Sequence, residues 1–266
     1  YPLRRQRQMC IRDSAKGVNV LIIDHVSPQL KTELKQRLSE LCWGIEQARS
    51  LPEFYSLSNT LMEFFKRFDS KNDATQLGIA GELVVHAVMP HILPEFNPTS
   101  MLFNKEERSI KKGFDFVFYE PASNEIWYGE AKSGRWSDRF TDSNEKARDL
   151  MTTSINGLSE MFANRELSRW AAAQNDASLV LSDASELDKV RELLMLDWNT
   201  SESEPCHPKG VFAAVVVNPR SHSEIDDTSS DKITDGIESL ASFSDFRAIV
   251  IQQDELETCL LYTSDA

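Results

Sequence analysis

The sequence predicts an α/β protein in which a mixed β-sheet is covered by flanking helices. Two apolar runs rich in β-branched residues, 211–218 and 246–252, are typical of strands buried on both faces. Residues 29–48 instead repeat apolar side chains three and four positions apart, which indicates a helix. Residues 114–132 have two apolar runs on either side of a turn-like Pro-Ala-Ser-Asn and predict a β-hairpin. Strands that alternate with helices, together with one hairpin, favour this fold class.

The other elements are expected in the following order. The helix at 75–89 is apolar nearly all round, so it should be buried and should stop at Pro90. Asp142, with Glu145 three residues later, provides a capping-box-like start for a helix over 142–163. We further expect strands at 18–24 and 99–104, helices at 51–68 and 183–197, and loops at 133–141 and 221–236.

Charge is spread unevenly along the 266 residues, which have a net charge of −13. Residues 170–266 contain 6 Lys and Arg against 19 Asp and Glu, whereas the rest of the chain is nearly balanced. The acidic C-terminal third should repel a phosphate backbone. Contact with nucleic acid is therefore expected through the middle of the chain, or through a basic partner.

Several features indicate a cytoplasmic protein that is not inserted in a membrane. The longest apolar run, 77–93, is too short and too polar to span a bilayer. The chain shows no secretory signal pattern, and its four cysteines lack paired spacing, as expected for free thiols in a reducing compartment. Residues 1–14 and 259–266 resemble translated sequencing-adapter read-through, so we expect both ends to lie outside the functional protein.

An acid-x-Lys triplet on the predicted hairpin is the first candidate for chemistry. Three such triplets occur, beginning at Glu33, Asp69 and Glu130, and about two are expected by chance from average composition. The triplet alone therefore carries no information. Only Glu130 and Lys132 are predicted to lie on a strand, where residues two apart share one face.

The expected hairpin register adds a second carboxylate. A turn about the bond between Ala122 and Ser123 pairs Asp115 with Glu130. Like charges directly opposite each other are destabilising unless one is protonated or a cation lies between them. A divalent cation is the simplest resolution, since Mg²⁺ prefers carboxylate and phosphate oxygens. Lys132 would then orient or help deprotonate an attacking water and offset charge in a phosphoryl transition state.

A third acid, Glu82, lies on the buried helix 75–89. Its helical neighbours are largely apolar, and glutamate is rarely buried unless it is paired or binds a ligand. The small residues Gly78, Ala80 and Gly81 would let this helix approach the sheet closely.

These residues, in this order, resemble the PD-(D/E)XK nuclease superfamily, and more narrowly the C-terminal domain of HamA, the effector of the Hachiman antiphage system. The motifs are Gly81-Glu82 on a helix, Gly113-Phe114-Asp115 on one strand, and Trp127-Tyr128-Gly129-Glu130-Ala131-Lys132 on the next. The resemblance covers about residues 75–165. Phe114 stands where the superfamily has proline before the first aspartate, which is the one departure.

The resemblance implies a restriction-endonuclease-like core over 75–258, on which a strand and helices of 15–74 pack. It implies DNA cleavage with Mg²⁺ (or Mn²⁺), catalysed by Glu82, Asp115, Glu130 and Lys132. Asp115, Glu130, Glu82 and the Ala131 carbonyl are the expected metal ligands. It further implies a HamB-like superfamily 2 helicase as a partner that restrains the nuclease.

Basic residues flank the hairpin on both sides. Lys111 and Lys112 precede it, and Arg135 and Arg139 follow it, so these four are candidates for phosphate contact. Interleaved acids make a solvated surface the simpler interpretation of these residues and of the nearby Lys146. Two alternatives to the catalytic hypothesis are an ion-pair network on a solvated hairpin, and a non-catalytic regulatory or binding subunit on a nuclease-like scaffold.

Overall fold

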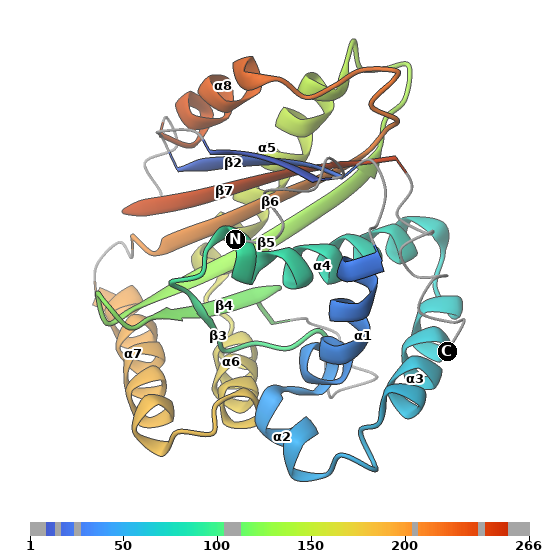
Figure 1. Cartoon of the computed structure of the whole chain (residues 1–266). Coiled ribbons are helices and arrows are strands. Elements are labelled where there is room, and N and C mark those ends of the chain that lie inside the picture. The colour runs from blue at the N-terminus through green and yellow to red at the C-terminus, as the bar shows by residue number, and fades with distance from the viewer. Residues whose placement is uncertain are drawn as a thin grey trace.

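The computed structural model describes residues 9–13, 17–23, 28–103, 113–203, 207–238 and 243–254. Its centre is a seven-stranded sheet in the order β1-β2-β7-β6-β5-β4-β3 (Figure 1). The strands are Met9–Asp13 (β1), Val18–Ile23 (β2), Asn97–Pro98 (β3), Phe116–Glu120 (β4), Glu125–Arg135 (β5), Lys209–Val217 (β6) and Asp245–Gln253 (β7). The helices are Pro28–Trp43 (α1), Ile45–Ser50 (α2), Leu57–Asp69 (α3), Asp73–Ile92 (α4), Ser143–Asn164 (α5), Leu167–Val180 (α6), Ala184–Ser203 (α7) and Asp227–Glu238 (α8).

The sheet is mixed, with a parallel centre and antiparallel edges. Strands β2, β7, β6 and β5 run parallel to one another, whereas β1, β4 and β3 pair antiparallel with their neighbours. The predicted core strands are confirmed as β6 and β7, and residues 210–217 of β6 are all buried. Complete burial of one Val or Ile side chain stabilises the fold by about 1.5–3 kcal/mol. The buried side chains of β6 therefore contribute strongly to the stability of the sheet.

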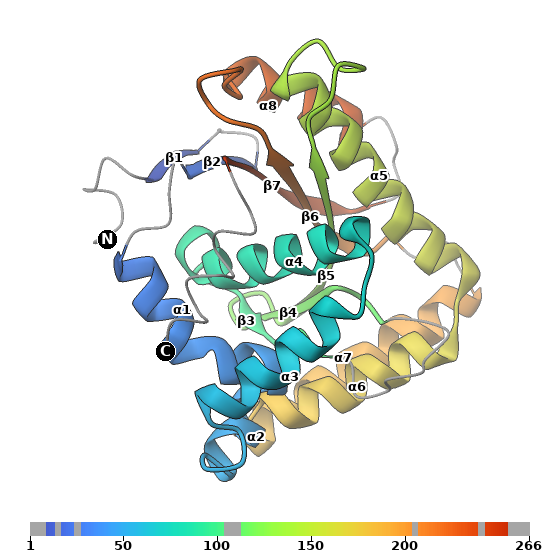
Figure 2. The ribbon, with the colours of Figure 1, turned by 90° about the vertical axis from the view of Figure 1, so that its right-hand side faces the viewer.

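Helices cover both faces of this sheet, which confirms the predicted α/β class. Alternate strand residues such as Phe116, Trp127 and Val215 pack with α1, α3 and α4 in one hydrophobic core. Their neighbours Val117, Tyr128 and Val216 point to the other face and pack with α5, α6, α7 and α8. Figures 1 and 2 show α4 lying across one face of the sheet and α5 running along the other.

The β4–β5 hairpin has the predicted register. Val117 pairs with Tyr128 and Tyr119 with Ile126, and the turn ends at Asn124, whose φ is 57°. The ladder stops at the pair Phe116 and Gly129. Strand β5 nevertheless continues to Arg135, so the loop expected from residue 133 begins only after that residue. Backbone pairing of β4 with β5 therefore ends just before the acid-x-Lys triplet, and from there on β4 no longer covers that edge of β5.

Two helix boundaries were wrong. The single helix expected over 29–48 is broken at Gly44, which has a φ of 91°. A Cβ there would lie 2.5 Å from the carbonyl oxygen of Leu179, so this position requires glycine. Helix α4 also passes through Pro90 instead of stopping there, and ends with the Leu93 amide donating to the Met89 carbonyl at 2.8 Å.

Three further expectations were wrong outside the hairpin. The strand expected over 99–104 is only Asn97–Pro98, because the amides of Leu102 and Phe103 donate to the last carbonyls of α1 instead. The acidic segment expected to be a loop over 221–236 contains α8, where Ile233 and Thr234 are buried. Helix α3 begins at Leu57, after the N-cap residue Ser56, so residues 51–55 lie outside it. Helix α6 had not been predicted.

At the N-terminal edge of the sheet, β1 pairs antiparallel with β2 from Met9 to Asp13. The sheet therefore includes residues that lie before the expected boundary at residue 14. In the described part of the chain, no helix combines the length and apolar character needed to cross a membrane.

Candidate active site

The predicted acid-x-Lys strand and the acid before β4 do come together. Asp115 directly precedes β4, and its Oδ2 accepts a hydrogen bond from the Ala131 amide at 3.0 Å. This bond continues the hairpin by one step after the backbone ladder has ended at Phe116. Asp115 is thereby fixed beside Glu130, as the sequence register predicted.

Glu130 is a buried carboxyl group with only part of its hydrogen-bonding capacity used. Its exposed fraction is 4 %, and its Oε1 accepts from Lys132 Nζ. Its Oε2 is buried and has no hydrogen-bond partner among the described residues. Desolvation, followed by the charge of Asp115, raises the pKa of Glu130 to about 8. Burial of Glu130 therefore lowers the stability of the fold. An ion-pair network on a solvated hairpin does not explain why an acid is buried here.

Lys132 lies at the solvent-accessible side of this pair, with its side chain 33 % exposed. Burial lowers the pKa of its ammonium group, but the charges of Glu130, Asp115 and Glu82 together raise it above the ordinary value. Lys132 is therefore protonated near neutral pH and acts as a hydrogen-bond donor and a fixed positive charge.

Glu82 approaches from the opposite side of the sheet. It follows Gly81 on α4, and α4 crosses β5 so closely that a Cβ at Gly81 would lie 1.6 Å from Ser133 Oγ. Asp115, Glu130 and Lys132 share the strand face that packs on α5, whereas α4 packs on the other face. The contribution of Glu82 to the Lys132 pKa places its charge near the site. Among the described residues, however, no three Asp, Glu, His or Cys side chains form a cluster able to hold a metal.

The donors that do converge fit a hard divalent cation. Two carboxyl groups repel each other, and one of them has a buried oxygen that no described residue contacts by a hydrogen bond. Mg²⁺ is commonly held by one or two carboxylates, while water and phosphate oxygens fill the remaining positions. The Ala131 carbonyl is a further candidate, because the N–H and C=O of a strand residue point to the same edge and its N–H points toward Asp115.

Helix α5 supports this site through residues that the sequence analysis did not identify. Ser154 Oγ donates to the Glu130 carbonyl at 2.6 Å. Gly157 faces the Glu130 side chain, and a Cβ there would make an ordinary contact with Oε1 at 3.4 Å. The sequence does show small residues on the buried face of 142–163. It does not show which strand residues they contact, because that depends on how α5 packs on the sheet.

The flanking basic residues differ in their environments. Lys146 is buried instead of solvated, and its Nζ lies 3.0 Å from Asp149 Oδ2 and beside Gly134 of β5. Arg139 is largely exposed and lies 3.9 Å from the same carboxylate oxygen, and Arg135 is exposed at the end of β5. Lys111 and Lys112 lie outside the described residues.

Comparison with known proteins identifies the family of the chain. No curated protein gives a significant match to the chain. The family model HamA matches residues 11–260, which is nearly the whole sequence and includes the candidate site and both helical layers. The chain therefore belongs to the HamA family.

Proposed function

We propose that this chain is a cytoplasmic, Mg²⁺-dependent nuclease of the PD-(D/E)XK type that hydrolyses DNA phosphodiester bonds. The observation that carries the proposal is the pairing of Asp115 with the buried Glu130 beside Lys132, where β4 releases the edge of β5. Membership of the HamA family associates the protein with Hachiman antiphage defence. Destruction of DNA is a suitable task for an effector of such a system.

In this proposal Asp115, Glu130 and the Ala131 carbonyl hold the metal. A bound Mg²⁺ or Mn²⁺ would polarise the scissile phosphate and lower the pKa of a water molecule. Since the described residues contain no cluster of three acidic ligands, we assign Glu82 to the hydration shell of the site. There its carboxylate would accept a hydrogen bond from a water and keep Lys132 charged.

Lys132 has a distinct role. Its raised pKa keeps it protonated, so it orients the attacking water and offsets negative charge on the phosphate instead of removing a proton. Arg135 and Arg139, on the exposed segment that follows, would contact the DNA backbone.

The acidic C-terminal third of the chain opposes DNA binding by the isolated protein. We propose that a HamB-like superfamily 2 helicase delivers DNA to the site and restrains cleavage until it is activated. The family and the charge distribution together support this partner.

Plasmid cleavage with Mg²⁺, by the chain alone and with the proposed HamB-like helicase, tests the proposal. Lys132→Met and Asp115→Asn should each reduce cleavage by roughly 100-fold or more, since loss of one transition-state contact typically costs this much. Lys209→Met is the matched control, because Lys209 also pairs with a glutamate, Glu125, but at the other end of β5. Equal cleavage by wild type and both site variants, or no cleavage by any preparation, would leave a non-catalytic subunit as the better account.

A further inference from the structure

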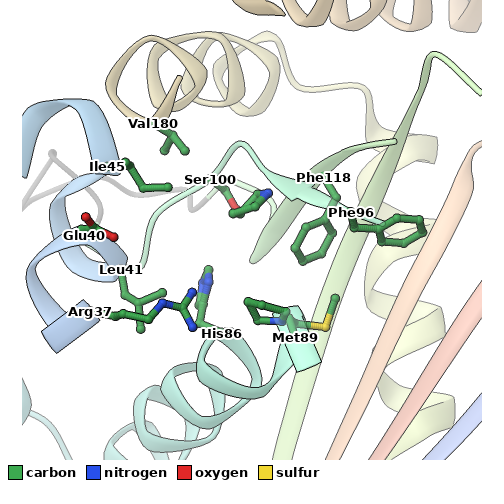
Figure 3. Close-up of a pocket in the computed structure, with 12 residues that line it drawn as sticks. Arg37, Glu40, Leu41, Ile45, His86, Met89, Phe96, Ser100, Phe118 and Val180 are labelled. Atoms are coloured by element: carbon green, nitrogen blue, oxygen red, sulfur yellow. The ribbon is translucent and has the colours of Figure 1, made fainter. Parts of the chain in front are cut away.

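A groove runs between the outer helices α6 and α7. It has a volume of about 460 Å³, and its lining residues lie between 167 and 174 on α6 and between 188 and 198 on α7. Figures 1 and 2 show these two helices side by side, at the end of the molecule away from α8. The cavity in Figure 3, beside His86 and Met89, has only about 30 Å³, which is room for one or two water molecules. Of these two openings, only the groove can receive part of another molecule.

The groove follows the helix axes, because its lining side chains recur four and then three residues apart on both helices. The residues with this spacing are Leu167, Ala171 and Gln174 on α6, and Asp188, Glu192 and Met195 on α7. At a rise of 1.5 Å per residue, each series extends over about 10 Å, or about two turns of a helix laid between them. A third helix packs in such a groove by fitting its side chains between those of the two helices.

One end of the groove, where α6 begins and α7 ends, is apolar. The ring centroids of Trp170 and Trp198 lie 5.9 Å apart there. Leu167 is 64 % exposed and Met195 is 57 % exposed. Together with the adjacent Leu196, they are three of the six large apolar side chains that are exposed in the described part of the chain. Exposed apolar side chains that gather beside tryptophan are typical of a protein-binding surface.

The other end of the groove is acidic. Asp188 and Glu192 are exposed, and their carboxylates have no ion-pair or hydrogen-bond partner among the described residues. Arg191 also lines the groove, but its Nη2 donates to Ser178 Oγ of α6 at 2.7 Å. Helix α7 as a whole has five acidic residues and two basic ones. The groove therefore attracts a basic ligand, and it repels a second copy of the same acidic surface.

We propose that the groove between α6 and α7 binds a basic amphipathic helix of a partner protein. Apolar side chains on one face of that helix contact Leu167 and Met195. Lys or Arg side chains about two turns further along pair with Asp188 and Glu192, because Asp188 and Met195 are seven residues apart on α7. Binding at the groove does not depend on the proposed nuclease activity.

The inner side of the groove contacts the β4–β5 hairpin. The ring centroid of Trp170 lies 5.5 Å from that of Phe114 and 5.4 Å from that of Tyr128. Phe114 directly precedes Asp115, and the Tyr128 hydroxyl donates to Asp197 Oδ2 of α7 at 2.7 Å. A helix bound in the groove is therefore separated from the hairpin by one layer of side chains.

Selection from a displayed library of helical peptides, with the full chain as the target, tests the proposal. We expect the enriched peptides to have a net positive charge, with Lys or Arg about seven positions from an apolar residue. Fluorescence anisotropy with the best labelled peptide should show saturable binding that weakens as the salt concentration rises, because salt screens ion pairs at a surface. Enrichment of neutral or acidic peptides, or of none, would overturn the proposal.

Variants of exposed residues locate the binding surface without disturbing the core. Met195→Glu, and Asp188→Lys combined with Glu192→Lys, should each weaken binding of the selected peptide by roughly ten-fold or more, as expected for central interface residues. Met62→Glu on α3 and Asp235→Lys on α8 are the matched controls, since both residues are exposed and lie outside the groove lining, and they should bind like wild type. Undiminished binding by both groove variants would overturn the proposal. A dimer in sedimentation equilibrium that Met195→Glu dissociates would also overturn it, because a second copy would then occupy the groove.

Discussion

Glu130 is a desolvated carboxyl group that is 4 % exposed on a strand packed inside the molecule. A valine at this strand position would be buried without an electrostatic penalty, whereas the carboxyl group is desolvated and lies beside Asp115. The hydrogen bond from Lys132 offsets only part of this penalty, since the pKa of Glu130 is still raised to about 8. A divalent cation between the two acids would remove both the repulsion and the unsatisfied oxygen.

The stability of the metal-free protein should therefore depend on pH through Glu130. Between its ordinary pKa of 4.5 and its raised value of about 8, the folded protein holds a proton that the unfolded chain has released. The free energy of unfolding should accordingly fall as pH rises through this interval. Urea denaturation in EDTA at a series of pH values measures the slope. Glu130→Gln should flatten it, and identical slopes for both proteins would refute the assignment.

Sequence reasoning identified the site residues that a strand period of two brings together. Asp115, Glu130 and Lys132 follow from the hairpin register, which depends only on local turn geometry. Ser154, Gly157 and Lys146 depend on how α5 lies over β5, and a single sequence does not specify that docking. Lys146 is an example. Its charged neighbours in the sequence predict a solvated side chain, but the side chain is buried against Gly134.

At the scale of elements, periodicity located most helices and strands but not all their ends. Gly44 breaks an apparently continuous apolar stripe with a positive φ, and a Cβ there would collide with Leu179, which is distant in sequence. Pro90 lies in the last turn of α4, so it removes one backbone hydrogen bond but only two helical residues follow it. Helix α8 has an acidic, serine-rich sequence typical of a loop, and its burial of Ile233 was not apparent from composition.

The close crossing of α4 over β5 predicts opposite effects for two glycines of the same helix. A Cβ at Gly81 would collide with Ser133, so Gly81→Ala should lower the free energy of unfolding by about 1–3 kcal/mol. A Cβ at Gly78 meets nothing within 4 Å, so Gly78→Ala should raise it by about 0.5–1 kcal/mol through helix propensity. Chemical denaturation measures both values. A neutral Gly81→Ala would show that the helix does not approach the strand this closely.

At the scale of the whole molecule, the sequence predicted the class of the sheet but not its strand order. Strand β6 follows three helices in the chain yet pairs with β5, and β7 then separates β6 from β2. These pairings join segments far apart in sequence, and several buried apolar runs are compatible with more than one neighbour. The order nevertheless matters for function, because it places β5 where a short β4 exposes one of its edges.

The charge distribution predicts weak DNA binding by the isolated chain. Net charge of −13, concentrated in residues 170–266, opposes the counterion release that drives non-specific binding. Fluorescence anisotropy with a labelled duplex should give a dissociation constant weaker than about 1 µM at about 150 mM salt. Nanomolar binding under these conditions would contradict the proposal that a partner delivers the DNA.

The most direct test of the central claim is calorimetric titration of the purified chain with Mn²⁺. We expect one saturable site that releases about one proton per ion at pH 7, because Glu130 must ionise before it binds metal. The released proton is measured from the dependence of the heat on the ionisation enthalpy of the buffer. Asp115→Asn should abolish this site, whereas Lys209→Met should retain it. Absence of saturable binding, or equal binding by Asp115→Asn, would contradict the account.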